Sequence, residues 1–309
     1  MRAFTRMAAA ALLALTTAST LASREPARQV RDDGPRIEIV FSKEARPEAV
    51  TGMVYVAISR DNKRSLIDDT GATGIPLFSR FVEGLTPGAA ATISSTDRGH
   101  PLKSLRDLPA GDYWMQPFVN VYTRFSRADG KTVWLHNDQW EGQDWKSSPG
   151  NLLGDPVRIS FDPKAATAIR LVANRAIPPV QVPADTAMVK RLRFQSDILS
   201  KWWGQPIYLG ATVLLPKDYD KHPDVRYPVN YIQGHFSLGA PGGFGRNGDF
   251  DRMWLSETAP RFLYVTLQHP SPYYDDSYGV NSENNGPYGD AITKELVPAV
   301  EEAAASARL

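Results

Sequence analysis

The sequence lacks three features that would narrow its function. It contains no cysteine, which excludes thiolate nucleophiles and cysteine metal ligands. Its net charge is only +1, from 35 Lys and Arg against 34 Asp and Glu, so a basic nucleic-acid-binding surface is not expected. No apolar run reaches the roughly 20 residues of a membrane-spanning helix. A chain of 309 residues is long enough to be held by a hydrophobic core without disulfides.

The first 22 residues have the pattern of an export signal. Arg2 and Arg6 precede the apolar run Ala8–Leu15, and Thr20-Leu21-Ala22 resembles a small-x-small cleavage site. We therefore expect cleavage near Ala22 and a secreted or periplasmic protein with no membrane span after signal removal. A retained short anchor is the alternative. The polar residues 23–34 that follow are predicted to be a linker.

Residues 35–165 have the pattern of a β-sandwich. Ile37, Ile39 and Phe41 share one face of a strand, with Glu38 and Val40 on the other. Further strands are expected at 53–58, 113–124, 132–135 and 156–161. Turn-forming residues separate these short runs at regular spacing, which is typical of a sandwich.

The pattern changes after residue 165. Three prolines, Pro178, Pro179 and Pro183, predict a linker over residues 166–188. Strands are then expected at 189–200, 207–215, 229–232 and 262–267, with helices near 250–257 and 287–305. Strands that alternate with helices predict a parallel α/β sheet.

The last predicted helix, at 287–305, has one apolar face and one awkward residue. The apolar positions at helical spacing are Ile292, Leu296, Val297, Val300 and Ala304. Pro298 lies among them and is expected to kink or split the helix, because an interior proline removes a hydrogen bond.

Three motifs in the second half suggest a family. Residues 209–219 end in LLPKDY, and residues 226–235 read RYPVNYIQGH. The third motif is Asp276-Ser277, followed by NNGPYGDA at 284–291 and ELVP at 295–298. Together they resemble the putative-esterase branch of the α/β-hydrolases, which includes S-formylglutathione hydrolases and enterochelin-esterase-like proteins. The third motif resembles a subgroup of secreted bacterial proteins with a β-rich front domain. The family's His-Gly pair is reversed here, as Gly234-His235.

The resemblance implies a β-sandwich N-terminal domain followed by an incomplete α/β-hydrolase domain at 189–309. In the family, the ELVP helix is followed by a strand and then by the G-x-S-x-G turn that holds the nucleophile. No G-x-S-x-G occurs in the 309 residues, and none of the five histidines lies late enough to be the family's catalytic His. We therefore expect no catalytic residue in this chain and no esterase activity from it alone. The strand at 229–232 would then be an exposed apolar edge, which predicts poor solubility or partial folding.

The resemblance also suggests two site features. The loop after the third strand supplies an oxyanion-hole N–H in the family, which points to the backbone of His235 or Phe236. A strand-ending turn is the alternative. A polar loop with Asp276, Asn284 and Asn285 could line a substrate pocket or bind Ca²⁺, although it lacks the spacing of a calcium loop. A turn that caps the following helix is the simpler interpretation.

No cofactor or metal site is expected. Residues 243–248 read G-x-G-x-x-G, but the segment does not directly follow a strand, and the next strand does not end in an acidic residue. We therefore interpret it as a flexible glycine loop.

Two functions are thus compared. The first is a secreted esterase-like hydrolase that acts on a small ester, of which this chain supplies the front domain and the oxyanion side. The second is a non-catalytic secreted protein whose β-sandwich binds a glycan or a partner. The aromatic pairs Trp202-Trp203 and Tyr273-Tyr274, with Trp134 and Trp140, could stack on sugars, although core packing is the commoner role. A chain that pairs with a separate second half is a third possibility.

Overall fold

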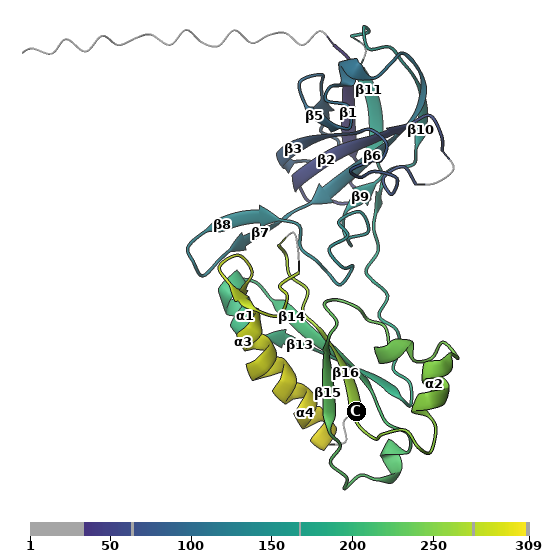
Figure 1. The fold of residues 1–309 in the computed structure, drawn as a ribbon. Helices are drawn as coiled ribbons and strands as arrows, with labels where there is room; N and C mark the ends of the chain where they lie inside the picture. Colours follow the sequence, from purple (N-terminus) through teal and green to yellow (C-terminus); the bar gives the residue numbers. More distant parts are fainter. Residues whose placement is uncertain (1–33, 63–64, 167, 274–275, 307–309) are drawn as a thin grey trace, which may run out of the picture. The chain divides into compact units, whose positions relative to one another are not determined.

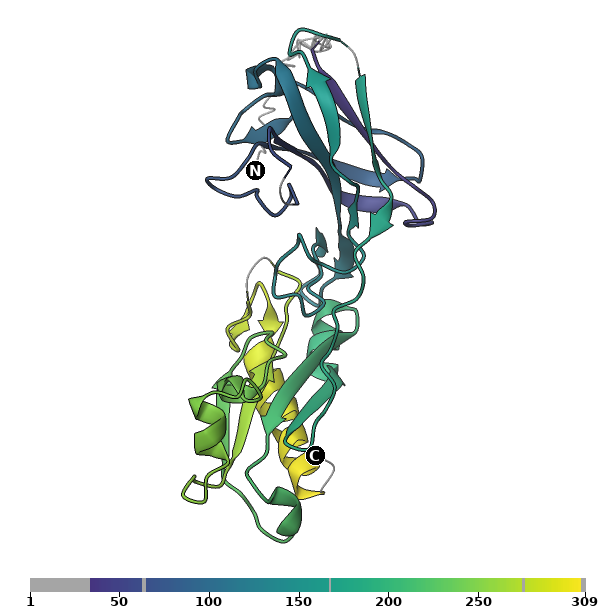
Figure 2. The ribbon, with the colours of Figure 1, turned by 90° about the vertical axis from the view of Figure 1, so that its right-hand side faces the viewer.

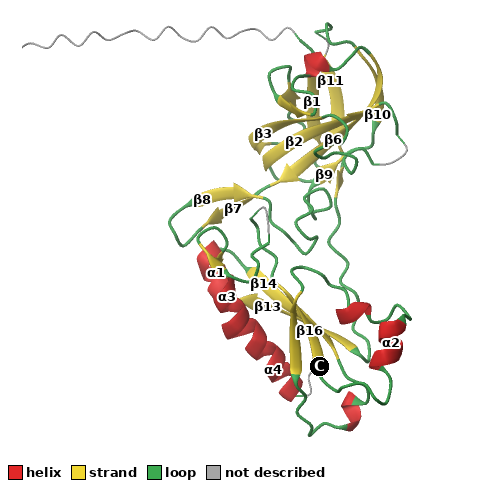
Figure 3. Ribbon diagram, viewed as in Figure 1, coloured by secondary structure: helices red, strands yellow, loops and turns green. Residues whose placement is uncertain are grey.

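The computed structural model describes residues 34–62, 65–166, 168–273 and 276–306. The predicted signal and nearly all of the first linker lie outside these ranges. Most of the regular structure is β-strand, and helices are few (Figure 3). Within the described part of the chain, no helix is long and apolar enough to cross a membrane.

Two sheets form the front half of the chain (Figure 1). The smaller sheet has the strand order β11-β1-β4, and the larger has the order β12-β9-β6-β2-β3-β5, with β10 also paired to β6. The strands are β1 Arg36–Phe41, β2 Val50–Ser59, β3 Leu77–Leu85, β4 Ala91–Ile93, β5 Arg98–His100, β6 Gly111–Val121, β9 Leu152–Leu153, β10 Val157–Phe161, β11 Ala168–Ala173 and β12 Arg175–Ala176.

Both sheets contribute to one hydrophobic core. Ile37, Ile39 and Phe41 of β1 are buried in it together with Val54 and Val56 of β2. The predicted alternation along β1 is therefore confirmed. The strand expected at 113–124 is divided, because β6 ends at Val121 and β7 begins at Thr123.

The predicted linker at 166–188 begins later than expected. Residues 168–176 form β11 and β12, and β11 pairs in parallel with the whole of β1. The burial of β11 alternates, with Leu171 and Ala173 facing the core, so these residues complete a sheet. Irregular structure starts at residue 177, where the three prolines lie.

A four-stranded mixed sheet forms the second half. Its strands are β13 Val189–Ser196, β14 Ile207–Leu214, β15 Val229–Gln233 and β16 Leu263–Gln268, in the order β13-β14-β16-β15. Only β15 and β16 are parallel, while the β13–β14 and β14–β16 pairs are antiparallel. The expectation of a parallel sheet is thus wrong for two of the three strand pairs, because β14 runs against the other three strands. Only the β15–β16 connection is long enough, and contains a helix, as a parallel crossover requires.

Helices cover both faces of this sheet (Figures 1 and 2). Leu263, Val265 and Leu267 of β16 share a core with Leu296 and Val300. Tyr264 lies between Leu263 and Val265 on the strand and packs against the core around Trp254 on the opposite face of the sheet. The helices are α1 Asp197–Trp203, α2 Asp249–Trp254, α3 Tyr288–Ala291, the π-helical turn η4 Ile292–Leu296 and α4 Val297–Ala305.

The segment predicted as a strand at 189–200 changes to helix at residue 197. Ser196 is the N-cap of α1, and its side chain accepts a hydrogen bond from the N–H of Leu199. Asp197 in the first turn favours the helix start. The cap overrides the strand pattern of the preceding residues.

The proline in the last helix is accommodated by a change of helix type. The apolar face predicted for this helix is confirmed, since Ile292, Leu296 and Val300 are buried. The π-helical turn η4 ends directly before α4, and Pro298 occupies the first turn of α4. The helical backbone runs without a break from α3 through η4 into α4, and the wider π-helical turn accommodates the ring and the missing N–H of a proline that would disrupt an α-helical interior. The chain therefore continues in one direction instead of splitting.

A hairpin from the front half contributes to the second core. It consists of β7 Thr123–Ser126 and β8 Thr132–Leu135. Phe125 and Leu135 are buried in the same core as Trp203, and the rings of Phe125 and Trp203 meet edge to face. The remaining short elements are η1 Leu105–Asp107, η2 Tyr219–Lys221, η3 Pro241–Gly243, β17 Asn281–Ser282 and β18 Gly286–Pro287.

Candidate functional site

The predicted oxyanion loop follows directly after β15. The N–H of Gly234 donates to the carbonyl of Leu267 and continues the pairing with β16. A Cβ atom at residue 234 would lie 1.8 Å from Cγ2 of Thr266, so only glycine fits there. This contact gives a physical reason for the order Gly-His at this position. His235 then turns the chain out of the sheet with a left-handed φ of 55°.

In this loop the backbone carbonyl of His235 is hydrogen-bonded, whereas, in the described part of the chain, the backbone N–H groups of His235 and Phe236 are not. The carbonyl of His235 accepts a hydrogen bond of 2.6 Å from the N–H of His269, which follows β16. The backbone N–H groups of His235 and Phe236 donate to no backbone or side-chain acceptor within the described ranges. Both residues are half-buried. The two groups named from the sequence are therefore available as donors.

Three ionisable side chains converge beside this loop. The Asp276 carboxylate contacts Nδ1 of His235 through Oδ2. Its other oxygen, Oδ1, lies 3.0 Å from Nδ1 of His269. Nδ1 of His269 is also 2.8 Å from the hydroxyl oxygen of Ser277. His269 is fully buried and Asp276 nearly so, while the side chain of His235 is 38% exposed. The cluster thus opens to solvent on the His235 side.

Burial controls the charge of His269. Loss of hydration, with a smaller effect from His235, lowers the pKa of His269 from 6.5 to about 4. The ring is therefore neutral at pH 7. His269 and His136 are the two buried histidines of the chain, and the local sequence did not predict the burial of either.

The other two predicted pocket residues lie elsewhere. Asn284 is exposed. Asn285 is held in place, since its Oδ1 accepts from the Ser271 hydroxyl at 2.7 Å and its carbonyl accepts from the Trp203 indole at 3.1 Å. In the same loop, Oδ1 of Asn281 accepts from the N–H of Asp290 at the start of α3, which is the helix-capping role weighed from the sequence. Of the predicted pocket residues, the structure brings only Asp276 to the loop of His235.

The glycine loop at 243–248 is organised around a carboxylate of the chain itself. Asp251 accepts hydrogen bonds from the N–H of Gly245 at 3.1 Å and from the N–H of Asn247 at 2.7 Å. Donors that would cradle a phosphate in a nucleotide site are thus already occupied by Asp251. The arrangement agrees with a glycine loop and gives no support to a cofactor.

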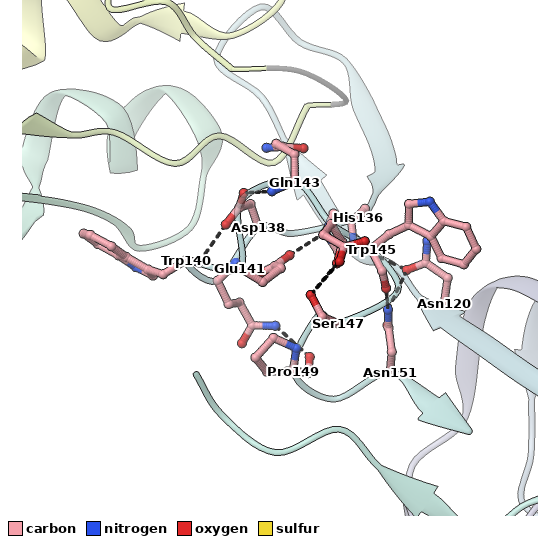
Figure 4. Close-up of polar contacts among 12 residues, drawn as sticks. Asn120, His136, Asp138, Trp140, Glu141, Gln143, Trp145, Ser147, Pro149 and Asn151 are labelled. Atoms are coloured by element: carbon pink, nitrogen blue, oxygen red, sulfur yellow. Dashed lines mark hydrogen bonds and ion pairs between the residues drawn. The ribbon is translucent and has the colours of Figure 1, made fainter. Parts of the chain in front are cut away.

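A second polar cluster, which the sequence did not indicate, lies in the loop after β8 (Figure 4). Nε2 of the buried His136 is 2.7 Å from Oε1 of Glu141. Nδ1 of His136 is 3.3 Å from Oδ1 of Asn120, which also accepts from Asn151. The sequence signal for this cluster was weak: a histidine and a glutamate, His136 and Glu141, lie five residues apart in a polar segment. These contacts connect the loop to β6 and fix its position.

Asp138 organises the same loop from within. Its two carboxylate oxygens accept from the N–H groups of Trp140 and Gln143, both at 2.6 Å. Burial, followed by repulsion from Glu141, raises the pKa of Asp138 from 3.8 to about 6. The loop contacts the second half directly, because Gln143 donates to the carbonyl of Ser271 and Phe236 lies against Gly142.

Two cavities lie near these segments. The larger is about 650 Å³ and includes Trp202, Lys131 and Glu283 in its lining. The smaller is about 320 Å³ and lies between Asp138, Trp140 and Arg193. The guanidinium of Arg193 lies 5.0 Å from the centre of a Trp140 ring. Among the tryptophans considered as possible sugar-stacking residues, Trp203 lies in the hydrophobic core, which is the commoner role of such rings. Trp134 is 38% exposed.

Comparison with known proteins adds no relative. No protein-family profile matches this chain. A search of curated proteins gives no significant match either.

Proposed function

We propose that this chain is the front part of an exported, esterase-like α/β-hydrolase that acts on small carboxylic esters. In this proposal a β-sandwich precedes an incomplete hydrolase domain, and the protein is secreted or periplasmic. The observation that carries the proposal is the pair of backbone N–H groups at His235 and Phe236, which directly follow a sheet strand and donate to no acceptor among the described residues.

The position of these donors suits ester chemistry. Attack on an ester carbonyl develops negative charge on its oxygen, and fixed N–H groups stabilise that charge. Open α/β sheets bind their ligands outside the carboxyl ends of the strands. His235 and His269 lie at the carboxyl ends of the parallel strands β15 and β16, and the backbone bond between them holds the loop in place.

The edge position of β15 gives further support. In the α/β-hydrolase family, the strand before the nucleophile lies next to the third strand. Here β15, the third strand of this sheet in chain order, lies at the edge of the sheet, and its side chains are half-buried or exposed, unlike those of β16. One side of β15 is therefore suited to pair with another strand.

A serine-directed probe tests this proposal. Antibodies raised against residues 34–306 would isolate the protein from its native host, and a fluorophosphonate would then label any activated serine. We expect labelling of the native protein, and its intact mass identifies the polypeptide that carries the label. The 309-residue chain produced alone is the control and should stay unlabelled, because it contains no G-x-S-x-G. An unlabelled native protein would contradict the hydrolase assignment.

The glycan-binding alternative is favoured by one observation, the larger cavity beside Trp202. Trp202 is half-buried, and its neighbours in the lining include Asp129, Lys131 and Asn281. An aromatic ring flanked by polar groups can stack on a sugar ring while the polar groups bond its hydroxyls. Binding to a polysaccharide array that is lost in Trp202→Ala and kept in Trp134→Ala would support this function. Equal binding by both variants would show that this cavity is not the glycan-binding site.

A further inference from the structure

The cluster of His235, His269 and Asp276 has the composition of a metal site. Two imidazoles and one carboxylate each offer one ligand atom, and these atoms all lie within 4.8 Å of one another. The three side chains come from separate segments: the loop after β15, the end of β16 and the loop before β17. The fold therefore brings together ligands that lie up to about forty residues apart in the sequence.

We propose that His235, His269 and Asp276 bind a divalent transition-metal ion, with Zn²⁺ as the preferred ion. Two imidazoles with one carboxylate suit zinc in sites with an open position, whereas Mg²⁺ and Ca²⁺ prefer oxygen ligands alone. The proposal does not depend on the esterase assignment, because it uses the side chain of His235 and not its backbone N–H.

The spacing of the ligand atoms is close to what zinc requires. Ligands at about 2.1 Å in a tetrahedral arrangement lie roughly 3.4 Å from one another. Nδ1 of His269 and Oδ1 of Asp276 are 3.0 Å apart. Nδ1 of His235 is in direct contact with Oδ2 of Asp276, closer than two zinc ligands lie, so this pair has to move apart. The widest separation in the set, at most 4.8 Å, has to close by up to roughly 1.4 Å. The half-exposed side chain of His235 can make both adjustments.

The contacts of the His269 ring also favour a cation. In a neutral imidazole one ring nitrogen carries a proton and the other offers a lone pair. Nε2 of His269 is buried and makes no hydrogen bond to any described residue, and the polar contacts of the ring run through Nδ1 to Asp276 and Ser277. When the proton is on Nε2, the lone pair of Nδ1 faces the carboxylate oxygen. A cation between them converts that repulsion into two bonds.

The site would keep a position open for a further ligand. Three protein ligands leave the fourth coordination position of tetrahedral zinc free. In catalytic zinc centres, water or a substrate occupies that position. His235 is the exposed member of the set, and the rings of Phe236 and Tyr278 lie 6.1 and 5.9 Å from its ring centre. These aromatic rings border the side from which an ion or a ligand would enter.

Metal titration of the 309-residue chain tests the proposal. The protein is stripped with a chelator and titrated with Zn²⁺ by calorimetry, and Co²⁺ then serves as an optical probe of the ligand field. We expect one equivalent of Zn²⁺ to bind, Co²⁺ to give a visible absorption band, and His235→Ala to weaken Zn²⁺ binding at least tenfold. His235→Ala keeps the backbone N–H and removes a half-exposed side chain, so the variant is expected to fold.

His222→Ala is the matched control, because His222 is an exposed histidine that does not belong to the cluster. Its Zn²⁺ affinity should equal that of the unmodified chain. Asp276→Asn, which keeps the side-chain shape, should lose the Co²⁺ band. The proposal is overturned if the unmodified chain binds no Zn²⁺, or if His235→Ala binds Zn²⁺ as tightly as His222→Ala does. In those cases the cluster is a hydrogen-bonded Asp–His pair without metal.

Discussion

Phe236 lies against the backbone of Gly142, so that a Cβ atom at residue 142 would be 2.7 Å from the ring. Gly142 also has a left-handed φ of 84°. We expect Gly142→Ala to destabilise the protein by about 1–2 kcal/mol for the strained backbone and by about 1–3 kcal/mol more for the clash. Gly150→Ala is the control, since Gly150 has a φ of 83° and no atom near its Cβ position. Denaturant unfolding measures both. Equal losses for the two variants would contradict the close approach of the Phe236 ring to Gly142.

Glu295 in η4 caps the start of α1. Its carboxylate accepts from the N–H of Ile198 at 3.0 Å and from the hydroxyl of Ser196. We expect Glu295→Ala to lower the free energy of unfolding by about 1–2 kcal/mol, because the cap bonds are lost. Glu302→Ala, which removes an exposed glutamate from α4, should change it by less than about 0.5 kcal/mol. Thermal unfolding, monitored by circular dichroism, measures both changes. A loss for Glu295→Ala as small as that for Glu302→Ala would contradict the capping role.

Asp138 should make stability depend on pH. Since its pKa rises from 3.8 to about 6 in the folded state, its contribution is fully present below pH 3.8 and is lost as the pH rises through about 6. The loss is on the order of 3 kcal/mol. In Asp138→Asn this loss is absent, so the variant should gain stability relative to the unmodified chain between pH 4 and pH 6.

Urea unfolding of both proteins across this range measures the effect of Asp138. His269 has the opposite sign: its contribution is present above pH 6.5 and is lost as the pH falls through about 4. It is common to both proteins and cancels in the difference. Asp144→Asn, in the same loop but exposed, is the control. A difference between Asp138→Asn and the unmodified chain that does not vary with pH would contradict the raised pKa.

The edge of β15 should promote self-association. An edge strand with apolar side chains offers unpaired backbone groups to other chains. We expect the 309-residue chain to associate with rising concentration, and Asn230→Lys, at an exposed position of β15, to reduce that association. Asn284→Lys adds the same charge in an exposed loop and should have no effect. Sedimentation velocity separates these outcomes, and a monomeric unmodified chain would sink the prediction.

Side-chain pattern predicted those strands that bury one face. β1 and the apolar face of the last helix followed from spacing alone, because burial imposes that spacing. β3 was missed, since most of its side chains are half-buried or exposed and its place depends on pairing with β2 and β5. β11 was hidden by the prolines that follow it.

The candidate site was predicted in its loop but not in its side chains. The resemblance located His235 and Phe236, because a motif marks the end of β15. The meeting of His235 with His269 depends on β15 and β16 being neighbours, and the strand order cannot be read from local spacing. His136 and Glu141 were missed for a similar reason, since their burial depends on contacts with β6.

The β7–β8 hairpin has a consequence for the order in which the chain folds during synthesis. Phe125 and Leu135 leave the ribosome early, but Trp203, against which Phe125 packs, follows Leu135 by roughly seventy residues. Until then the front sheets can close around their own core, while the hairpin exposes apolar side chains that have nothing to cover them. During synthesis the chain thus exposes an apolar surface at this hairpin, and the hairpin is covered only after α1 has been made.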